Sequence, residues 1–222
     1  MVQKTLRKSF WSVLVLTALC SSAWAKVLVR KEPPVTISVH NDADIPLDVL
    51  RQAESEASRI FRQSGVEIHW LNCLPPQVFA QHPSGCATAS FPRYLQLRIA
   101  KRSLNLNEFT MGIAYLSADG IGCYADLFSD RAREIQASSH VSTAIILGHG
   151  IAHEIGHLLL GSNSHAPTGI MRARWQFADL ASANEGRLLF SPLESQEMRN
   201  KLAAWLTHAR NDSPIDTARL GD

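Results

Sequence analysis

The sequence predicts an α+β domain in which a mixed, twisted sheet of five strands packs on two main helices, with one more helix near the C-terminus. Three stretches alternate apolar and polar side chains as strands do, one spaces apolar residues as an amphipathic helix does, and one is apolar on most sides. The chain has 222 residues, 45% of them hydrophobic and 19% charged, as in ordinary globular proteins. Its formal net charge of +2 is too small to attract nucleic acid strongly, so we expect no nucleic-acid partner.

Residues 1–25 have the pattern of a secretory signal peptide. A basic start at 4–8 precedes an apolar run at 10–20, and Ala23-Trp24-Ala25 forms a small-x-small cleavage site. The apolar run is shorter than the about 20 residues of a membrane span. We therefore expect cleavage near Ala25-Lys26, a secreted or periplasmic protein, and no membrane span in the mature form.

The mature chain keeps three cysteines, Cys73, Cys86 and Cys123. Export implies an oxidising compartment, where disulfides persist. Cys73 and Cys86 flank a loop rich in proline, glycine and serine, so they are the favoured pair. Three single pairings are possible, however, and the sequence does not choose among them.

The first part of the mature domain predicts a strand–helix–strand unit with parallel strands. Alternating apolar residues mark strands at 35–39 and 66–70. Between them, Asp44-Ile45-Pro46 opens a helix, because proline suits the first turn, and Gly65 ends it. The predicted apolar face of this helix consists of Leu50, Ala53, Ala57, Ile60 and Phe61.

Three further strands complete the predicted sheet. Residues 73–92 contain four prolines and form a long loop, and a strand follows at 95–99. The stretches 111–117 and 122–128 are the last two strands. Only Ala118 to Ile121 separate them, which favours antiparallel pairing and makes the sheet mixed.

Two helices are predicted after the sheet. The first, from about Ser139 to Leu160, is apolar on most sides and therefore expected to be buried. The second begins at Ser191-Pro192-Leu193-Glu194, a capping-box pattern with proline at the first helical position. Its predicted packed face consists of Leu193, Met198, Leu202, Trp205 and Leu206. One domain would then span 26–210, followed by a flexible tail at 211–222.

The buried helix carries the motif H-E-x-x-H at His153-Glu154-Ile155-Gly156-His157. Residues four apart share a helix face, about 6 Å apart along the axis, so both imidazoles can point at one ion. Neutral imidazole suits zinc, and Glu154 can act as general base on water that the metal activates. We therefore predict one catalytic Zn²⁺ held by His153 and His157. His149 lies on the same face but too far along the helix for the same ion, so we predict a packing or supporting role.

The stretch from His153 to Met171, HEIGHLLLGSNSHAPTGIM, resembles the metzincin clan of zinc peptidases, to which matrixins and adamalysins belong. The clan pattern is H-E-x-x-H-x-x-G-x-x-H followed by a methionine turn. The spacing departs from that pattern. Gly161 lies eight residues after His153 and His165 lies twelve after it, where the clan has seven and ten.

The resemblance implies a zincin-like fold and a secreted metalloendopeptidase. His165 would be the third zinc ligand, and Met171 would form the methionine turn under the metal. A peptide or protein substrate would lie along the wall formed by 111–128, with Tyr115 and Tyr124 flanking the cleft. We expect the protein to be a monomer.

The sequence leaves two alternative functions open. One is a secreted metal-binding or peptide-binding module without turnover, although an intact Glu154 speaks against it. The other is a gluzincin-like hydrolase with an acidic third zinc ligand. Asp179, Glu185 and Glu194 are the candidates for that ligand.

Overall fold

Five strands form one mixed sheet in the order β2-β1-β3-β5-β4. The strands are β1 (Val35–Asn41), β2 (Ile68–Cys73), β3 (Tyr94–Ala100), β4 (Gly112–Tyr115) and β5 (Tyr124–Phe128). β1 pairs in parallel with β2 and β3, and β3 pairs in parallel with β5. β4 is antiparallel to β5 and lies at the edge of the sheet. The α+β class, the five strands and the mixed pairing are therefore confirmed.

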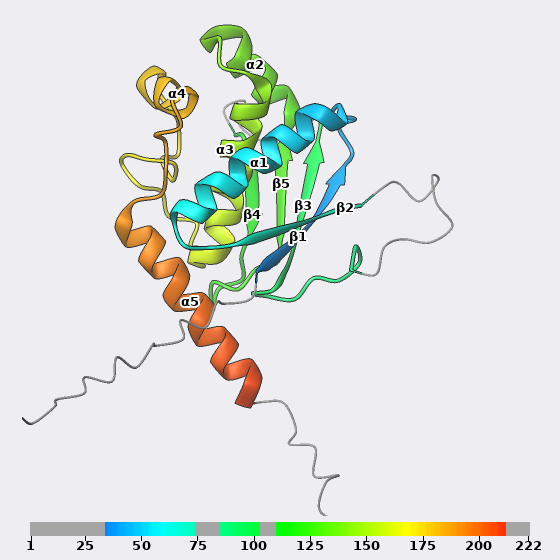
Figure 1. Cartoon of the computed structure of the whole chain (residues 1–222), viewed down its shortest axis with the longest axis vertical. Coiled ribbons are helices and arrows are strands. Elements are labelled where there is room, and N and C mark those ends of the chain that lie inside the picture. The colour runs from blue at the N-terminus through cyan, green and yellow to red at the C-terminus, as the bar shows by residue number, and fades with distance from the viewer. Residues whose placement is uncertain (1–33, 74–84, 103–109, 212–222) are drawn as a thin grey trace, which may run out of the picture. The chain divides into compact units, whose positions relative to one another are not determined.

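The computed structural model describes residues 34–73, 85–102 and 110–211 (Figure 1). The predicted signal peptide at 1–25 lies outside the described residues. So do residues 212–222 of the predicted tail.

Two helices, α1 (Leu47–Gln63) and α3 (Thr143–Leu160), pack against each other and cover one face of the sheet (Figure 1). Alternate strand residues such as Ile37, Leu97 and Leu127 point into this layer and are fully buried. The other face carries polar and aromatic side chains, because strand neighbours point to opposite sides of a sheet. The core therefore lies between the sheet and these two helices.

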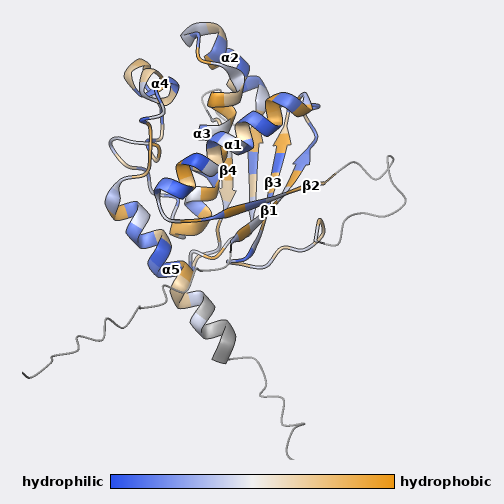
Figure 2. Cartoon of the chain, in the orientation of Figure 1, coloured by the Kyte–Doolittle hydropathy of each residue, from blue (hydrophilic) through white to orange (hydrophobic). Residues whose placement is uncertain are grey.

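The apolar face predicted for α1 is confirmed, since all five of its predicted residues are buried. The side of α1 that faces the viewer in Figure 2 is largely hydrophilic. The Asn41 side chain stabilises the turn before the helix. Its Oδ1 accepts a hydrogen bond from the Ile45 N–H at 3.0 Å, and its Nδ2 donates one to the Ile45 carbonyl at 2.8 Å.

The helix predicted from about Ser139 to Leu160 begins later, and a separate helix precedes it. α2 (Ser129–Ser139) ends where His140 adopts a left-handed conformation, with φ of 58°. α3 then starts afresh, because the Ser142 hydroxyl accepts a hydrogen bond from the Ile145 N–H at 3.3 Å. α2 was not predicted, since its sequence is mostly polar and only Ser129 and Ala132 are buried.

α3 is the central helix of the core. Among the described residues it is the only helix long and apolar enough to match a membrane span, but 89% of that stretch is buried inside the molecule. Gly161, with φ of 59°, ends the helix. The Lys201 ammonium group donates a hydrogen bond to the carbonyl of Leu160 and so ties the end of α3 to the C-terminal helix.

Two helices follow α3 in the sequence. α4 (Phe177–Asn184) is short and was not predicted. α5 (Pro192–Asn211) begins with the predicted capping box. The Ser191 N–H donates to Glu194 Oε2 at 2.7 Å, and the Glu194 N–H donates to Ser191 Oγ at 3.2 Å.

The packed face predicted for α5 is correct only in part. Met198 is buried, Leu202 is half-buried, and the Trp205 ring lies 5.2 Å from that of Phe91. Leu193 is 78% exposed, so its assignment to this face was wrong. The reason is helical geometry, because residues five apart, such as Leu193 and Met198, lie about 140° apart around the axis. The side chain of Leu206 lies outside the described part of the structure.

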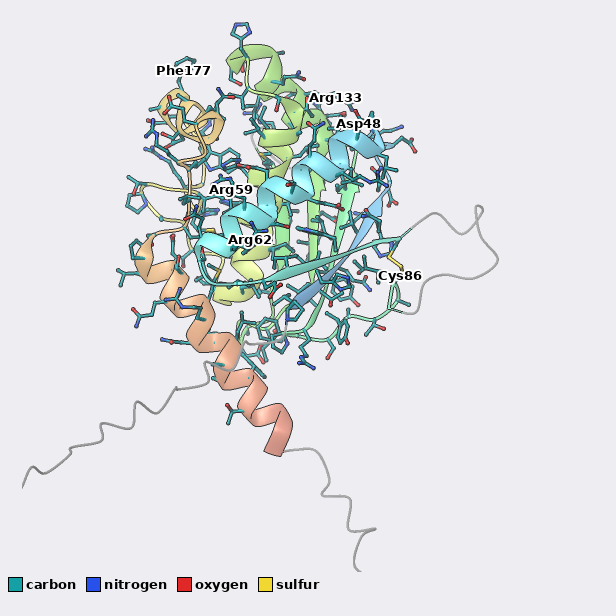
Figure 3. The ribbon with its side chains drawn as sticks, viewed as in Figure 1. Asp48, Arg59, Arg62, Cys86, Arg133 and Phe177 are labelled. Atoms are coloured by element: carbon teal, nitrogen blue, oxygen red, sulfur yellow. A yellow bond between two sulfur atoms is a disulfide. The ribbon has the colours of Figure 1, made fainter. Side chains whose placement is uncertain are left out.

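A disulfide joins Cys73 to Cys86, the pair favoured from the sequence, with 5.7 Å between their Cα atoms. The bond is visible beside the Cys86 label in Figure 3. It links the end of β2 to the segment that leads into β3. Of the described cysteines, Cys123 is unpaired and half-buried.

Candidate metal centre

His153 and His157 lie on the same face of α3 and are almost completely buried. Their Nε2 atoms are 3.1 Å apart. The Nδ1 atoms both point to backbone carbonyls, at 2.7 Å from the Ile170 oxygen for His153 and 2.7 Å from the Ser162 oxygen for His157. Because a carbonyl only accepts, each Nδ1 carries the proton and each Nε2 presents a lone pair.

Two lone pairs that face each other at this distance repel unless a cation lies beside them. Two nitrogens bound to one tetrahedral zinc at about 2.0–2.1 Å are about 3.3 Å apart, close to the observed separation. The carbonyl partners also fix the ring orientation, as they do in known zinc sites. The two rings therefore fit the requirements of one metal ion.

His165 joins the same group from the loop that follows α3. Its ring centroid lies 5.4 Å from that of His153 and 4.9 Å from that of His157. One nitrogen from each of the three rings lies within 4.8 Å of the others. The longer spacing is accommodated because α3 continues to Leu160 and the loop from Gly161 to His165 turns back.

The acidic candidates for the third ligand are engaged elsewhere. Asp179 caps α4 and pairs with Arg172, Glu185 pairs with Arg187, and Glu194 caps α5. In the described part of the chain, the one group of three or more metal-binding side chains is that of His153, His157 and His165. The geometry therefore favours a three-histidine site over the gluzincin-like alternative.

The segment around Met171 packs directly against α3. Met171 is 1% exposed, and a Cβ atom added to Gly156 would lie 3.0 Å from its sulfur. The Met171 carbonyl accepts a hydrogen bond from the Ala166 N–H at 2.9 Å, which closes the loop after His165. Because the preceding residue, Ile170, holds the ring of His153, this segment fixes the position of a candidate ligand.

Trp175 supports the same contact. Its indole Nε1 donates to the Ile170 carbonyl at 3.1 Å, so that carbonyl accepts from both Trp175 and His153. The Trp175 ring lies 6.1 Å from His153 and 6.1 Å from His149. His149 is fully buried, and its Nδ1 lies 2.9 Å from the Ile145 carbonyl, in keeping with the predicted packing role.

Glu154 is 4% exposed and lines the same pocket as the three histidines. Burial raises the pKa of its carboxyl to about 8. A Cβ atom at Gly112 would lie 2.6 Å from Glu154 Cγ and 2.5 Å from the Asp126 carbonyl. Only glycine allows β4 to approach the carboxyl this closely, and a glycine inside a predicted strand is the sequence signal for such an approach.

Burial also lowers the pKa of the three histidines. The pKa of His153 falls to about 3, chiefly by desolvation and then by the charge of His157. The pKa values of His157 and His165 also fall, with desolvation as the largest cause. All three imidazoles are therefore neutral near pH 7, which is the form that binds a metal.

The site opens into a pocket of about 470 Å³. One wall is the start of β4, another is one side of α2, and a third is the loop that runs from Asn163 to Trp175. Two arginines of this loop, Arg172 and Arg174, and Arg131 of α2 also line the pocket. These arginines are not among the site residues predicted from the sequence, although Arg172 and Arg174 form a basic pair directly after Met171 that was a signal for them.

Tyr115 and Tyr124 lie on a different surface from the one predicted. They are 48% and 51% exposed and line a second hollow on the face of the sheet opposite to α1 and α3, together with Arg98 and Asp126. The Tyr115 hydroxyl donates to Asp126 Oδ2 at 2.9 Å. Strand alternation explains this placement, because Gly112 and Ala114 face α3 and so Tyr115 must face the opposite side.

No protein-family model matches the sequence, and no curated protein matches it significantly. Among solved structures, the chain is similar to archaemetzincin from Methanopyrus kandleri, with a TM-score of 0.49 and 16% identity over 79% of this chain and 99% of that one. It is also similar to a zinc-dependent peptidase from Methanocorpusculum labreanum, with a TM-score of 0.47 and 16% identity over 73% and 99%. Likeness at this level does not establish a family, so the function has to follow from the site itself.

Proposed function

We propose that the protein is a zinc-dependent metalloendopeptidase in which His153, His157 and His165 hold one Zn²⁺ and Glu154 is the general base. The observation that carries the proposal is the convergence of three imidazoles beside a buried carboxyl. Their nitrogens lie within 4.8 Å of one another, and the Nδ1 protons of two rings are committed to carbonyls. Without a cation, the Nε2 lone pairs of His153 and His157 would face each other at 3.1 Å and repel.

When bound, the ion would polarise the scissile carbonyl and acidify water in the pocket. Glu154 has the position to take the proton of the attacking water on a carboxylate oxygen. The water oxygen then bonds to the carbonyl carbon, and Glu154 passes the proton to the amine nitrogen as the C–N bond breaks. Burial raises the pKa of this carboxyl to about 8 in the metal-free protein, and a cation bound beside it would favour the carboxylate, the form that accepts a proton.

The edge strand β4 provides a place for the substrate backbone. Its residues Gly112, Ile113 and Ala114 line the pocket, and in the described sheet its outer side has no partner strand. An extended peptide can add to such an edge through main-chain hydrogen bonds. A peptide or protein substrate is therefore proposed to run along β4 and place one peptide bond at the histidines.

We further propose that the protein acts outside the cytoplasm, after cleavage near Ala25-Lys26. The support comes from the signal pattern of residues 1–25 and from the Cys73–Cys86 disulfide, which suits an oxidising compartment. The monomeric state remains a prediction.

The first prediction tests metal and base separately. The mature wild-type protein should hold about one zinc per chain and cleave a peptide panel. Glu154→Gln should keep the zinc, because the ligands are intact, and lose a factor of about 10²–10⁴ in kcat/KM. Metal analysis and mass spectrometry of the peptide products measure both.

In the same experiment, His165→Ala tests whether His165 is the third zinc ligand. It should bind zinc more weakly than the wild type and lose activity, whereas full zinc affinity and activity in this variant would refute its role as third ligand. Wild-type protein that binds zinc but cleaves nothing in the panel would instead favour the metal-binding or peptide-binding module. An undiminished rate in Glu154→Gln would show that another group is the base.

A further inference from the structure

Arginine is the most frequent charged residue in the described lining of the pocket that contains the three histidines. Arg131, Arg172 and Arg174 line it, whereas Glu154 is the one carboxyl among the described lining residues. Arg131 comes from α2, and the other two come from the loop after His165. Arginines from two separate elements therefore line one pocket.

Arg172 is held in place by the start of α4. Its Nη1 lies 3.1 Å from Asp179 Oδ2, and the same oxygen accepts the Gln176 N–H at 2.8 Å. The Arg172 side chain is 28% exposed, and Asp179 does not line the pocket. A guanidinium has five N–H donors, so one ion pair orients Arg172 and still leaves donors for a second carboxylate.

Arg131 is held in a similar way on α2. Its Nη1 lies 3.0 Å from Glu134 Oε2, and its side chain is 23% exposed. Ile135 and Ser138 line the pocket as well, at spacings that place them on the same face of the helix. α2 therefore turns one face, with Arg131 on it, toward the metal site.

Arg133 provides an internal comparison on the same helix. It also pairs with an acidic residue three positions away, Asp130, but it is 55% exposed and does not line the pocket (Figure 3). The two arginines share their helix and their kind of ion pair and differ in the face that they occupy. Replacement of Arg133 therefore controls for the loss of a charge on α2.

Resting on the metallopeptidase function proposed above, we propose that this pocket selects peptides that carry a carboxylate next to the cleaved bond. Arg131, Arg172 and Arg174 are the specificity-determining residues. Guanidinium and carboxylate groups form charge-assisted, often bidentate hydrogen bonds, which are strong where water is partly excluded. A peptide supplies such a carboxylate either from an aspartate or glutamate side chain or from its C-terminus.

The test uses the zinc-loaded mature protein and peptides that differ at one position. A cleaved peptide is made with Glu, Gln or Lys beside the scissile bond, and each is made with a free or an amidated C-terminus. The Glu peptide should exceed the Gln peptide in kcat/KM by about tenfold or more, and the Lys peptide should be poorest. If the free C-terminus is the group recognised, amidation will cause the loss instead. Added salt should reduce the preference.

The variants Arg131→Gln and Arg174→Gln should lower kcat/KM for the acidic peptide more than for the Gln peptide, so that the ratio between the two falls. Arg133→Gln should leave the ratio between the two peptides as in the wild type. Equal cleavage of the Glu, Gln and Lys peptides by the wild type, with no effect of amidation, would overturn the proposed preference while the peptidase function stands. An equal loss in Arg133→Gln would show that the net charge of α2, rather than the pocket, sets the ratio.

Binding to the zinc-loaded Glu154→Gln variant separates this proposal from the peptidase function. The fluorescence anisotropy of labelled peptides then reports affinity without cleavage. Tighter binding of the acidic peptide supports the carboxylate selection even where the wild type cleaves nothing. Equal affinity for the acidic and neutral peptides, with no effect of amidation, contradicts it.

Discussion

Backbone groups, as much as side chains, fix the positions of His153, His157 and Glu154 in the candidate metal site. The Ile170 carbonyl orients His153, the Ser162 carbonyl orients His157, and Gly112 leaves room for Glu154. At this site Ile170 and Ser162 act through their backbone carbonyls, and Gly112 acts through its lack of a side chain. They act because a carbonyl fixes a tautomer and because the absence of a Cβ permits a close approach.

The buried carboxyl of Glu154 makes the stability of the metal-free protein depend on pH. Its pKa is about 8 in the folded state and has an ordinary value of 4.5 in the unfolded chain, so the folded state binds more protons between these limits. Stability should therefore fall as the pH rises from 5 to 8. Glu154→Gln removes this effect, so its stability relative to the wild type should increase over that range by about 2–4 kcal/mol.

Urea unfolding of the two metal-free proteins at pH 5 and pH 8 measures this change. The histidines are common to both proteins. Their lowered pKa values favour the folded state above the unfolded pKa near 6.5 and weaken it as the pH falls, but this contribution cancels in the difference. A difference that does not vary with pH would mean that Glu154 ionises normally in the folded protein.

At the scale of elements, α3 holds three of the candidate site residues, His153, Glu154 and His157. It is the central core helix, its ends are defined by Ser142 and Gly161, and the loops after it return two carbonyls and His165 to its own histidines. The short α2 and α4 are less buried, and they place Arg131 and Arg172 around the pocket. The helix of the core thus fixes the metal ligands, while peripheral helices shape the surroundings.

The N-cap of α3 should contribute measurably to stability. Ser142→Ala removes the acceptor for the Ile145 N–H and should lower the free energy of unfolding by about 1 kcal/mol. Ser142→Gly should cost only a few tenths of a kcal/mol, because glycine is also tolerated at an N-cap. Denaturant unfolding of both variants checks this order, and an equal cost for both would argue against the cap.

At the scale of the whole molecule, the metal would link segments that are far apart in the chain. α3 would supply two ligands, and the loop after it would supply the third ligand and provides the carbonyl that holds His153. That loop then leads to α4 and α5, and α5 returns to the end of α3 through Lys201. Binding at one point therefore stabilises the arrangement of the C-terminal half against the core.

Removal of metal should lower the melting temperature of the mature protein, and added zinc should restore it. A ligand that binds only the folded state at 100 times its dissociation constant adds about 2.7 kcal/mol. Glu154→Gln should retain this zinc-dependent shift, while His157→Ala should lose it. Differential scanning fluorimetry with a chelator and with returned zinc measures both. A shift of equal size in His157→Ala would locate the zinc elsewhere.

The sequence determined much of this protein by local pattern alone. Alternation and helical spacing gave the strands, α1 and the capping box of α5, because these features depend on near neighbours in the chain. The His153, Glu154 and His157 spacing predicted a metal-binding face of a buried helix for the same reason, and the favoured Cys73–Cys86 pair is the one that the structure joins.

Tertiary structure decided what depends on contacts between distant segments. It brought His165 to the other histidines and gave the Ile170 and Ser162 carbonyls their role. It turned Tyr115 and Tyr124 to the opposite face of the sheet, and it placed the polar helix α2 beside the metal pocket. Such contacts leave no periodic signal in the chain, because they depend on how loops close and on which face of a strand the core covers.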